Sequence, residues 1–509
     1  MHWKELVRVA LIGTDRAKLS PELLKSLESL GVDTSQDATQ ILLEGASMLS
    51  LINKTQGQLQ DWKGTLPSPG KSDSTNPCSP KSSNHLSLIL SGNYESALSE
   101  FLSHLINNKK CLPPEKLPDL LDQCLSNPEL WQKLRFTIGE RGEWLIQQNP
   151  DWHILTFTPQ KIDWETGSSD QRIALLKHLR KYETDKVTPI IKETWEEDSL
   201  KDRVKFIETL EINLSKKDEP FLETCLDNNR KEIRKSAAHL LSLLPDSDLV
   251  QRMFDRLKNL MVLKTGVLKK SKLEVSLPEN EIDELIRDGI DPSAQWYKGG
   301  IKASRLGQMI AIVPPKFWED HFKKDTAETL QLFIRSNWSE LLLQALTQAA
   351  FKDKNEAWME TIVSFWIQNH DRQRWDNFKP KKLLEILPAH LFNQLALESL
   401  NTKDNVFDEN APITEILKSS NHFWKNELTL KVIQKMQDWI AGASSGYWSG
   451  WHLRTILKQA AYACNPNLYE TLQKGWTTNS YIWTSWERDI DNFLSILKFR
   501  KDMIEELEK

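Results

Sequence analysis

Three arginines recur at one fixed spacing in the middle of the chain. Arg172, Arg203 and Arg234 lie 31 residues apart, and five apolar columns coincide when the three segments are aligned on them. These columns are Leu175, Phe206 and Ala237; Leu176, Ile207 and Ala238; Leu179, Leu210 and Leu241; Ile191, Leu222 and Met253; and Trp195, Leu226 and Leu257. A fixed period of this length indicates stacked units that cannot bury their apolar faces alone. We therefore predict an α-solenoid over residues 165–260, with two helices in each unit.

The period of this solenoid is shorter than that of a usual HEAT unit, and the signature residues of TPR units are absent. The segment LDNNRKEIRKSAAHLLSLL, residues 226–244, is nevertheless similar to the second helix of a HEAT repeat. In that family an arginine and a turn carboxylate form a ladder along the stack. The similarity implies that Arg172, Arg203 and Arg234 link neighbouring repeats, with Arg234 bonded to turn carbonyls or to acids such as Asp227. We expect a structural role for this column and not a ligand site.

The chain has 509 residues, which is too long for one ordinary compact core. Helical patterns appear at Trp3–Leu11, Pro21–Leu30 and Thr39–Ile52, whereas the following segment is rich in Ser and Pro and almost lacks aliphatic residues, which favours a flexible linker. The predicted parts are an N-terminal helical segment (1–61), the linker (62–85), a helical domain that contains the repeats (86–260), a connector (261–300) and a Trp-rich C-terminal helical domain (301–509).

The connector carries the one β signal in the sequence. Leu273, Val275 and Leu277 alternate with polar residues, and the segment VLKTGVLKK before them can pair with them across a turn at Gly266. Gly289 is placed to end the helix that follows. The predicted fold class is therefore all-α, a HEAT-like helical repeat (α-solenoid) with a small β-hairpin connector.

Composition limits where the protein acts and what it binds. The net charge of −5 and the pI near 6.2 give no general attraction to nucleic acids or membrane surfaces. Five cysteines without a CxxC pair are typical of a reduced cytosolic protein. The charged N-terminus does not resemble a signal peptide, and no run of 18 apolar residues occurs. We therefore expect a cytoplasmic protein that does not bind membranes.

Tryptophan is unusually frequent, with 20 in the chain and 13 between Trp296 and Trp486. Most of these rings are expected to fill space between helices. The alternative is an aromatic groove for a peptide or a partner helix, since Trp and Tyr anchor many interfaces. The best candidate for such a groove is the loop GYWSGWHLR at 446–454, which presents Tyr447, Trp448, Trp451 and Arg454.

Motifs that would carry chemistry are absent from the sequence. It contains no HExxH, no GxSxG elbow and no dinucleotide-binding GxGxxG, so we predict no catalytic, cofactor or metal site. Asp288 and Asp291 form a possible carboxylate pair, but cap and turn roles are expected for them. The strongest basic patches, which are either solvated loops or a nucleic-acid face, are Lys258, Lys264, Lys269, Lys270, Lys272 and the KPKK run at 379–382.

Four segments together resemble one bacterial family of unknown function. They are WKELVRVALIGTDR (3–16), GERGEWLIQQNPDW (139–152), RDGID (287–291) and GIKASRLGQMIAIVPPKFW (300–318), and the resemblance extends nearly from end to end. Its members are large HEAT-like helical proteins encoded near a SWIM zinc-finger protein, a MoxR-type AAA+ ATPase and von Willebrand A-domain proteins. The resemblance implies membership of a multi-protein assembly and transfers no catalytic residues.

The function predicted from these observations is a non-catalytic scaffold for protein–protein interaction, with the MoxR-type ATPase or the SWIM zinc-finger protein as candidate partners. The alternative is nucleic-acid binding, or base excision of the kind that some HEAT-like DNA glycosylases perform, which the acidic net charge disfavours. An enzyme whose residues converge only in three dimensions remains a third class.

Overall fold

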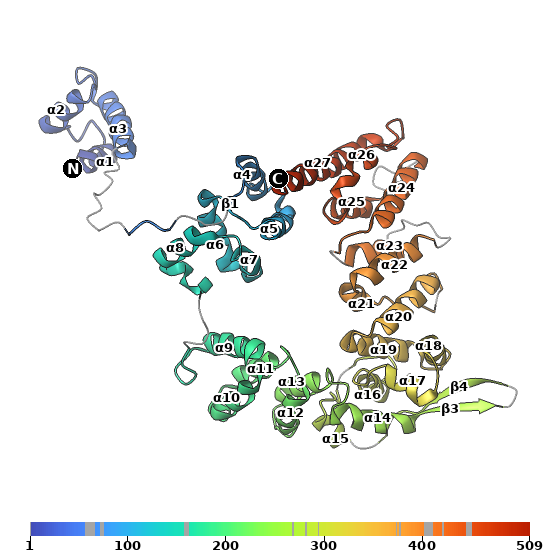
Figure 1. The fold of residues 1–509 in the computed structure, drawn as a ribbon. Helices are drawn as coiled ribbons and strands as arrows, with labels where there is room; N and C mark the ends of the chain where they lie inside the picture. The colour runs from blue at the N-terminus through green and yellow to red at the C-terminus, as the bar shows by residue number, and fades with distance from the viewer. Residues whose placement is uncertain are drawn as a thin grey trace. The chain divides into compact units, whose positions relative to one another are not determined.

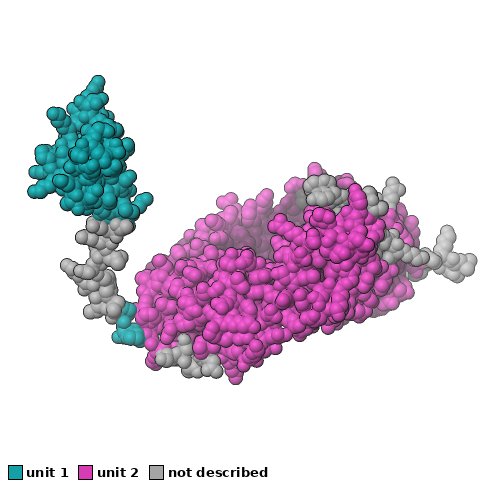
Figure 2. All heavy atoms as spheres, turned by 90° about the horizontal axis from the view of Figure 1, so that it is seen from above, with its two compact units in different colours: residues 1–69 teal, residues 70–509 magenta. Residues whose placement is uncertain are grey.

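The computed structural model describes residues 2–55, 67–71, 76–156, 162–266, 269–279, 282–293, 295–372, 374–375, 378–401, 411–419, 422–443 and 450–509. The chain divides into two compact units, residues 1–69 and residues 70–509 (Figure 2). Helices account for most of the described residues (Figure 1), which confirms the all-α prediction. None of the described helices combines the length and the apolar character needed to cross a bilayer.

The described residues of unit 1 form three helices: α1 (His2–Ile12), α2 (Pro21–Ser29) and α3 (Ala38–Thr55). All three were predicted from the sequence. The Ser20 hydroxyl accepts a hydrogen bond from the Leu23 N–H at 3.1 Å, and Pro21 occupies the first turn, so both residues favour a helix start. A small core that includes Leu6 and Leu27 joins the three helices.

The first part of unit 2 is built from short helices and one parallel strand pair. Its elements are β1 (Asn76–Pro77), α4 (Pro80–Leu90), α5 (Leu98–Asn107), β2 (Lys110–Cys111), α6 (Leu117–Ser126), α7 (Pro128–Leu134) and α8 (Gly139–Gln148). The structure differs here from the sequence prediction, because α4 begins inside the predicted linker 62–85. The Ser79 hydroxyl accepts a hydrogen bond from the Ser82 N–H at 3.1 Å. Serine and proline at this position therefore start a helix; residues 62–66 and 72–75 lie outside the described residues.

Six helices form the predicted repeats: α9 (Ser169–Tyr182), α10 (Val187–Thr194), α11 (Leu200–Thr209), α12 (Glu219–Leu226), α13 (Lys231–Leu241) and α14 (Asp248–Leu260). Each unit of 31 residues is one helix pair, and its arginine occupies the fourth position of the first helix. Every aligned apolar residue is buried except Trp195, which is partly buried. The first helices α9, α11 and α13 pack side by side and form what we call the first layer.

A hairpin and a short helix follow the third repeat. Strands β3 (Met261–Gly266) and β4 (Lys269–Val275) pair antiparallel, with Met261 opposite Val275, which confirms the predicted hairpin. Helix α15 (Ile282–Arg287) ends before Gly289, which has φ +84°. A Cβ atom on Gly289 would lie 2.4 Å from the Cβ of Ala238, so this turn packs too closely on α13 for any other residue.

The helices after the hairpin continue the same two-layer arrangement. They are α16 (Ile301–Ile310), α17 (Lys316–Phe322), α18 (Thr326–Ile334), α19 (Ser339–Asp353), α20 (Glu356–Asn369), α21 (Lys381–Ile386), α22 (Ala389–Leu400), α23 (Pro412–Ser419), α24 (Asn426–Gly442), α25 (Trp451–Ala463), α26 (Tyr469–Leu472) and α27 (Trp483–Leu507). Helices α19, α21, α23, α25 and α27 pack successively and extend the first layer, while α18, α20, α22 and α24 form the other layer.

One hydrophobic core runs through both halves of this solenoid. It extends from Trp164 to Leu497 and includes Met261 and Leu273 of the hairpin. The described part of the predicted connector 261–300 therefore contributes to the same core as the helices on its two sides, and these helices form one continuous solenoid.

The last turns of α27 pack on the first helices of unit 2, α4 and α5 (Figure 1). Phe499, Met503 and Leu507 are buried in one core with Leu86 and Phe101. The Phe499 ring also stacks on Tyr94, with centroids 3.9 Å apart. The final helix of the chain thus completes the core of residues 78–152.

Candidate binding surface

The predicted aromatic loop is described only in its second half. Tyr447 and Trp448 lie outside the described residues. Trp451 opens α25 with 58% of its surface exposed. The Lys418 ammonium, from α23, lies 5.8 Å from the centroid of the Trp451 ring. Two neighbouring helices of the first layer therefore present an exposed indole beside a cation.

Arg454, the fourth residue of the predicted site, is engaged within the fold. Its guanidinium donates a hydrogen bond to the Ser485 carbonyl at 2.8 Å and lies 3.3 Å from the Asp489 carboxylate. It also lies over the ring of Trp486, 5.2 Å from the centroid. Arg454 therefore joins α25 to α27 and is less free than Trp451 to meet a partner.

Most of the other tryptophans that the structure describes pack between helices. Trp318, Trp358, Trp366, Trp424 and Trp486 are almost completely buried, and all five belong to the hydrophobic core of the solenoid. The expectation that most rings serve packing is confirmed for these five. Trp451 differs from them because it is the most exposed of the described tryptophans.

The arginine column contacts the turns between repeats. Arg172 donates to the Asp198 carboxylate at 2.6 and 3.1 Å and lies between the rings of Trp164 and Phe206. Arg203 donates to the Asp198 carbonyl at 2.9 Å, and Arg234 donates to the carbonyl of Asn228 at 2.6 Å. Arg203 and Arg234 therefore bind the turn that precedes their own helix. Arg172 binds the turn that precedes the first helix of the next repeat, α11.

Asp227, expected as a partner of Arg234, instead accepts a hydrogen bond from Arg287 at 2.7 Å. Asp288 is buried and accepts hydrogen bonds from Arg252, Arg256 and Arg287 at 3.0, 2.6 and 3.2 Å. Three arginines therefore neutralise this carboxylate and tie α15 to α14.

Asp291 has a separate role from Asp288. Its carboxylate lies 2.7 Å from the Lys235 ammonium and accepts a hydrogen bond from the Ser293 N–H at 3.0 Å. The Lys235 ammonium and Ser293 hold the pKa of Asp291 well below its usual range. The two aspartates thus have different partners and do not form a carboxylate pair.

Three of the six lysines of the basic patches whose side chains the structure describes form ion pairs. Lys258 pairs with Asp255 at 2.6 Å, Lys264 with Glu274 at 2.7 Å, and Lys379 with Glu415 at 3.3 Å. The side chains of Lys269 and Lys270 lie outside the described residues. These patches therefore present less free positive charge than their sequence suggests.

An open pocket of about 250 Å³ lies on the first layer, between α13, α16, α19 and the turn after α15. We call it the α13–α19 pocket. Apolar side chains and five polar ones line it; the lining residues are Lys235, Ala238, His239, Gly289, Ile290, Trp296, Gln308, Ala311, Ile312, Gln348 and Lys352. This pocket could not be predicted from the sequence, because its walls come from segments more than 100 residues apart.

Two basic groups of the α13–α19 pocket have lowered pKa values. Burial, with a smaller effect from Lys382, lowers the pKa of the Lys352 ammonium to about 8. Partial desolvation of the ring, followed by repulsion from Lys352, lowers the pKa of His239. At neutral pH the pocket therefore contains a charged lysine beside a largely neutral imidazole.

Comparison with known proteins gives one match. A family model with the description "Family of unknown function (DUF5691)" matches residues 5–507. No curated protein and no solved structure matches the chain. The matched range includes most of unit 1, the solenoid, Trp451 and the α13–α19 pocket.

Proposed function

The chain belongs to this family of unknown function, and within it we propose that the protein is a non-catalytic helical-repeat scaffold that binds other proteins. The continuous two-layer solenoid supports the proposal, because stacked repeats create extended surfaces that are suited to partner binding. The resemblance noted in the sequence supplies two candidate partners, a MoxR-type AAA+ ATPase and a SWIM zinc-finger protein.

The observation that carries this proposal is the exposed pair of Trp451 and Lys418. A tryptophan with 58% of its surface in solvent lacks most of the favourable free energy that burial of the ring in a core or an interface provides. Tryptophan is also one of the residues that dominate the energetics of many protein interfaces, and Lys418 adds a cation beside its ring. We therefore place a docking surface on α23 and the start of α25.

Affinity capture of the tagged chain from its native host tests the proposal. We expect co-purifying proteins in constant ratio, present with and without nuclease treatment. The Trp451→Ala variant should lose them. The matched control is Tyr481→Ala, because Tyr481 is also an exposed aromatic, at 75%, outside the docking surface. Absence of any constant partner, or equal loss in both variants, would contradict the proposed docking surface.

Nucleic-acid binding is the second candidate, and the same pair of residues favours it. An exposed indole can stack on a base while a neighbouring lysine contacts phosphate. The paired lysines of the basic patches and the net charge of −5 weigh against this function. Partners that disappear on nuclease treatment, or nucleic acid retained by the wild-type chain and lost by Trp451→Ala, would favour it over the scaffold.

A further inference from the structure

We propose that the α13–α19 pocket binds a carboxylate, supplied by a glutamate side chain in an acidic segment of a partner protein. This inference rests on the proposed function and names the chemistry of part of the partner. It adds a second contact site, on the same layer as Trp451 but formed by different helices.

The first step of the argument is the unpaired charge of Lys352. This side chain is half-buried in the wall of the pocket, and among the described residues no acceptor or carboxylate pairs with its ammonium. Another cation, Lys382 of α21, also disfavours the charged form of Lys352. A partly desolvated charge without a partner is unfavourable, so an anion that enters the pocket supplies the missing interaction.

The second step is that two polar side chains of the pocket wall, Lys235 and Gln308, are already bonded to Asp291, which lies beside the pocket and does not line it. Asp291 holds Lys235 at 2.7 Å, and Gln308 donates to the Asp291 carbonyl at 3.1 Å and accepts from the Asp291 N–H at 2.9 Å. Lys235, Asp291 and Gln308 therefore satisfy one another. Lys352 and Gln348 are left to donate hydrogen bonds to an incoming group.

The third step decides between a carboxylate and a phosphate. His239 is largely neutral at pH 7 and Lys235 is neutralised by Asp291, so Lys352 supplies the one uncompensated positive charge among the lining residues. A single ammonium beside an amide matches a monoanionic, planar carboxylate, whereas a phosphate dianion favours several cations or arginine forks.

The last step concerns the rest of the ligand. Ala311 and Ile312 are buried at the pocket wall, and the Trp296 ring is partly buried beside them. These apolar groups suit the methylene stem of a glutamate side chain, while Gln348 and Lys352 are available to its carboxylate. The pocket thus has the composition typical of protein ligand sites, in which apolar walls surround a few convergent polar groups.

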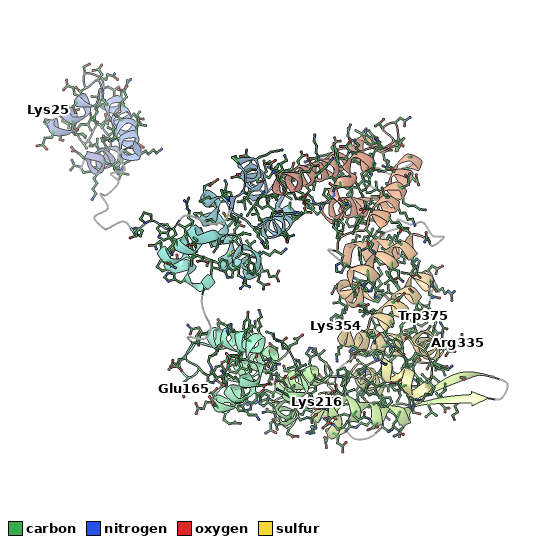
Figure 3. All side chains as sticks on the ribbon, viewed as in Figure 1. Lys25, Glu165, Lys216, Arg335, Lys354 and Trp375 are labelled. Atoms are coloured by element: carbon green, nitrogen blue, oxygen red, sulfur yellow. The ribbon has the colours of Figure 1, made fainter. Side chains whose placement is uncertain are left out.

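The test uses the full chain and three fluorescent peptides of one length. The first carries glutamates in a Gly/Ser/Leu background, the second has glutamine at the same positions, and the third has phosphoserine. We expect saturable binding of the glutamate peptide, and a loss of affinity of at least about tenfold with the glutamine peptide or with the Lys352→Met variant. The control is Lys354→Met, because Lys354 (Figure 3) is an exposed lysine just beyond α19 and does not line the pocket.

A second measurement does not depend on the stability of the Lys352→Met variant. Lysines of the native chain are dimethylated with ¹³C, and the resonance missing from Lys352→Arg is followed by NMR. This resonance reports the pKa of the Lys352 amine, which is near 8. The pKa should rise when the glutamate peptide is added, since a bound carboxylate favours the charged amine. A phosphoserine peptide that binds more tightly, or an unchanged resonance in all three titrations, would overturn the proposal.

The inference and the proposed function can fail separately. If captured partners persist with wild-type chain and with Lys352→Met, and the glutamate peptide does not bind, the carboxylate site is wrong while the scaffold stands. If free glutarate saturates the pocket as tightly as the peptide does, the ligand is a small acid and the assignment to a partner protein is wrong.

Discussion

Arg500, in the last helix, binds Glu100, 400 residues earlier in the chain. Its Nε and Nη2 donate to the two carboxylate oxygens at 2.7 and 2.8 Å. Its Nη1 donates to the carbonyls of Ala461 and Cys464 at 2.7 and 2.9 Å. Only 1% of Arg500 is exposed, so one side chain fastens α27 to α5 and to the end of α25.

Removal of the Arg500 guanidinium should loosen the contact between the two ends of unit 2. Arg500→Met leaves two buried carbonyls and a carboxylate without their donor, and we expect unit 2 to lose about 3–5 kcal/mol of stability. Urea unfolding monitored by tryptophan fluorescence measures the loss. Hydrogen exchange should increase most in α4 and α5.

Arg488→Met is the control for Arg500, since Arg488 lies on the same helix and is exposed. It should change the free energy of unfolding by less than about 0.5 kcal/mol. Equal effects of the two substitutions, or unchanged exchange in α4 and α5, would show that Arg500 does not hold the ends together.

Arg180 should matter more for stability than Arg203 of the periodic column. It is 1% exposed and donates to the carbonyls of Leu210, Ile212 and Asn213 and to both oxygens of Asp218. Arg180→Met should therefore cost about 3–5 kcal/mol in urea unfolding. Arg203→Met should cost about 1 kcal/mol, since its partners are one carbonyl at 2.9 Å and more exposed groups. The reverse order would contradict this assignment.

The sequence predicted the elements whose signal is local. The 31-residue register located three helix pairs, and the apolar alternation after Gly266 located the hairpin. The register did not identify Arg180 as important. The equivalent positions in the next two repeats, 31 and 62 residues later, hold Glu211 and Ser242, so Arg180 does not belong to a repeated arginine column. Burial of this arginine depends on the turn that contains Asn213, which only the folded stack brings to it.

Contacts between distant segments were not predictable in the same way. Periodicity within α27 indicates a helix but does not identify its partners, and Arg500 meets Glu100 only through the path of the whole solenoid. The α13–α19 pocket has the same origin, since His239 and Lys352 come from helices that are separated in the sequence by the hairpin and by helices α14 to α18. The helix start at Pro80 was missed because Ser and Pro occur in linkers and in helix caps alike.

Gly289→Ala should destabilise the turn at the edge of the α13–α19 pocket. A side chain at φ +84° is strained, and its Cβ would lie 2.4 Å from that of Ala238, so we expect a loss of about 2–4 kcal/mol. Gly92→Ala is a matched control, because Gly92 has φ +89° and nothing within 4 Å of the added Cβ. It should lose about 1 kcal/mol. Equal losses in thermal unfolding would exclude the contact with Ala238 as the cause.

The cysteines should react only after the chain unfolds. All five are buried, and burial raises the pKa of Cys78 to about 11 and that of Cys124, Cys225 and Cys464 to about 12. Since the thiolate is the reactive form, native protein at pH 8 should react slowly with a thiol reagent such as DTNB. In guanidinium chloride five thiols should react at once. Rapid reaction of a native thiol would show that its segment opens readily.

Lys352 should give the protein a stability that rises with pH. Burial lowers the pKa of this lysine from 10.5 to about 8 in the folded chain, so the unfolded chain binds more protons between these values. The free energy of unfolding must therefore increase from pH 8 to pH 10.5. Below pH 8 the folded chain bears the full cost of holding the charged lysine partly out of water. Relative to Lys352→Met, the wild type should gain about 1–3 kcal/mol between pH 7 and pH 10.

Urea unfolding of the wild type and Lys352→Met at the two pH values measures this difference. The comparison cancels the other titrating groups, including His239, Lys235 and Lys382, which are present in both chains. Binding of the glutamate peptide should weaken over the same range, because the neutral amine no longer attracts a carboxylate. A stability difference that stays constant with pH would mean that Lys352 keeps its solvent and its ordinary pKa, and the unpaired charge on which the carboxylate site depends would then be absent.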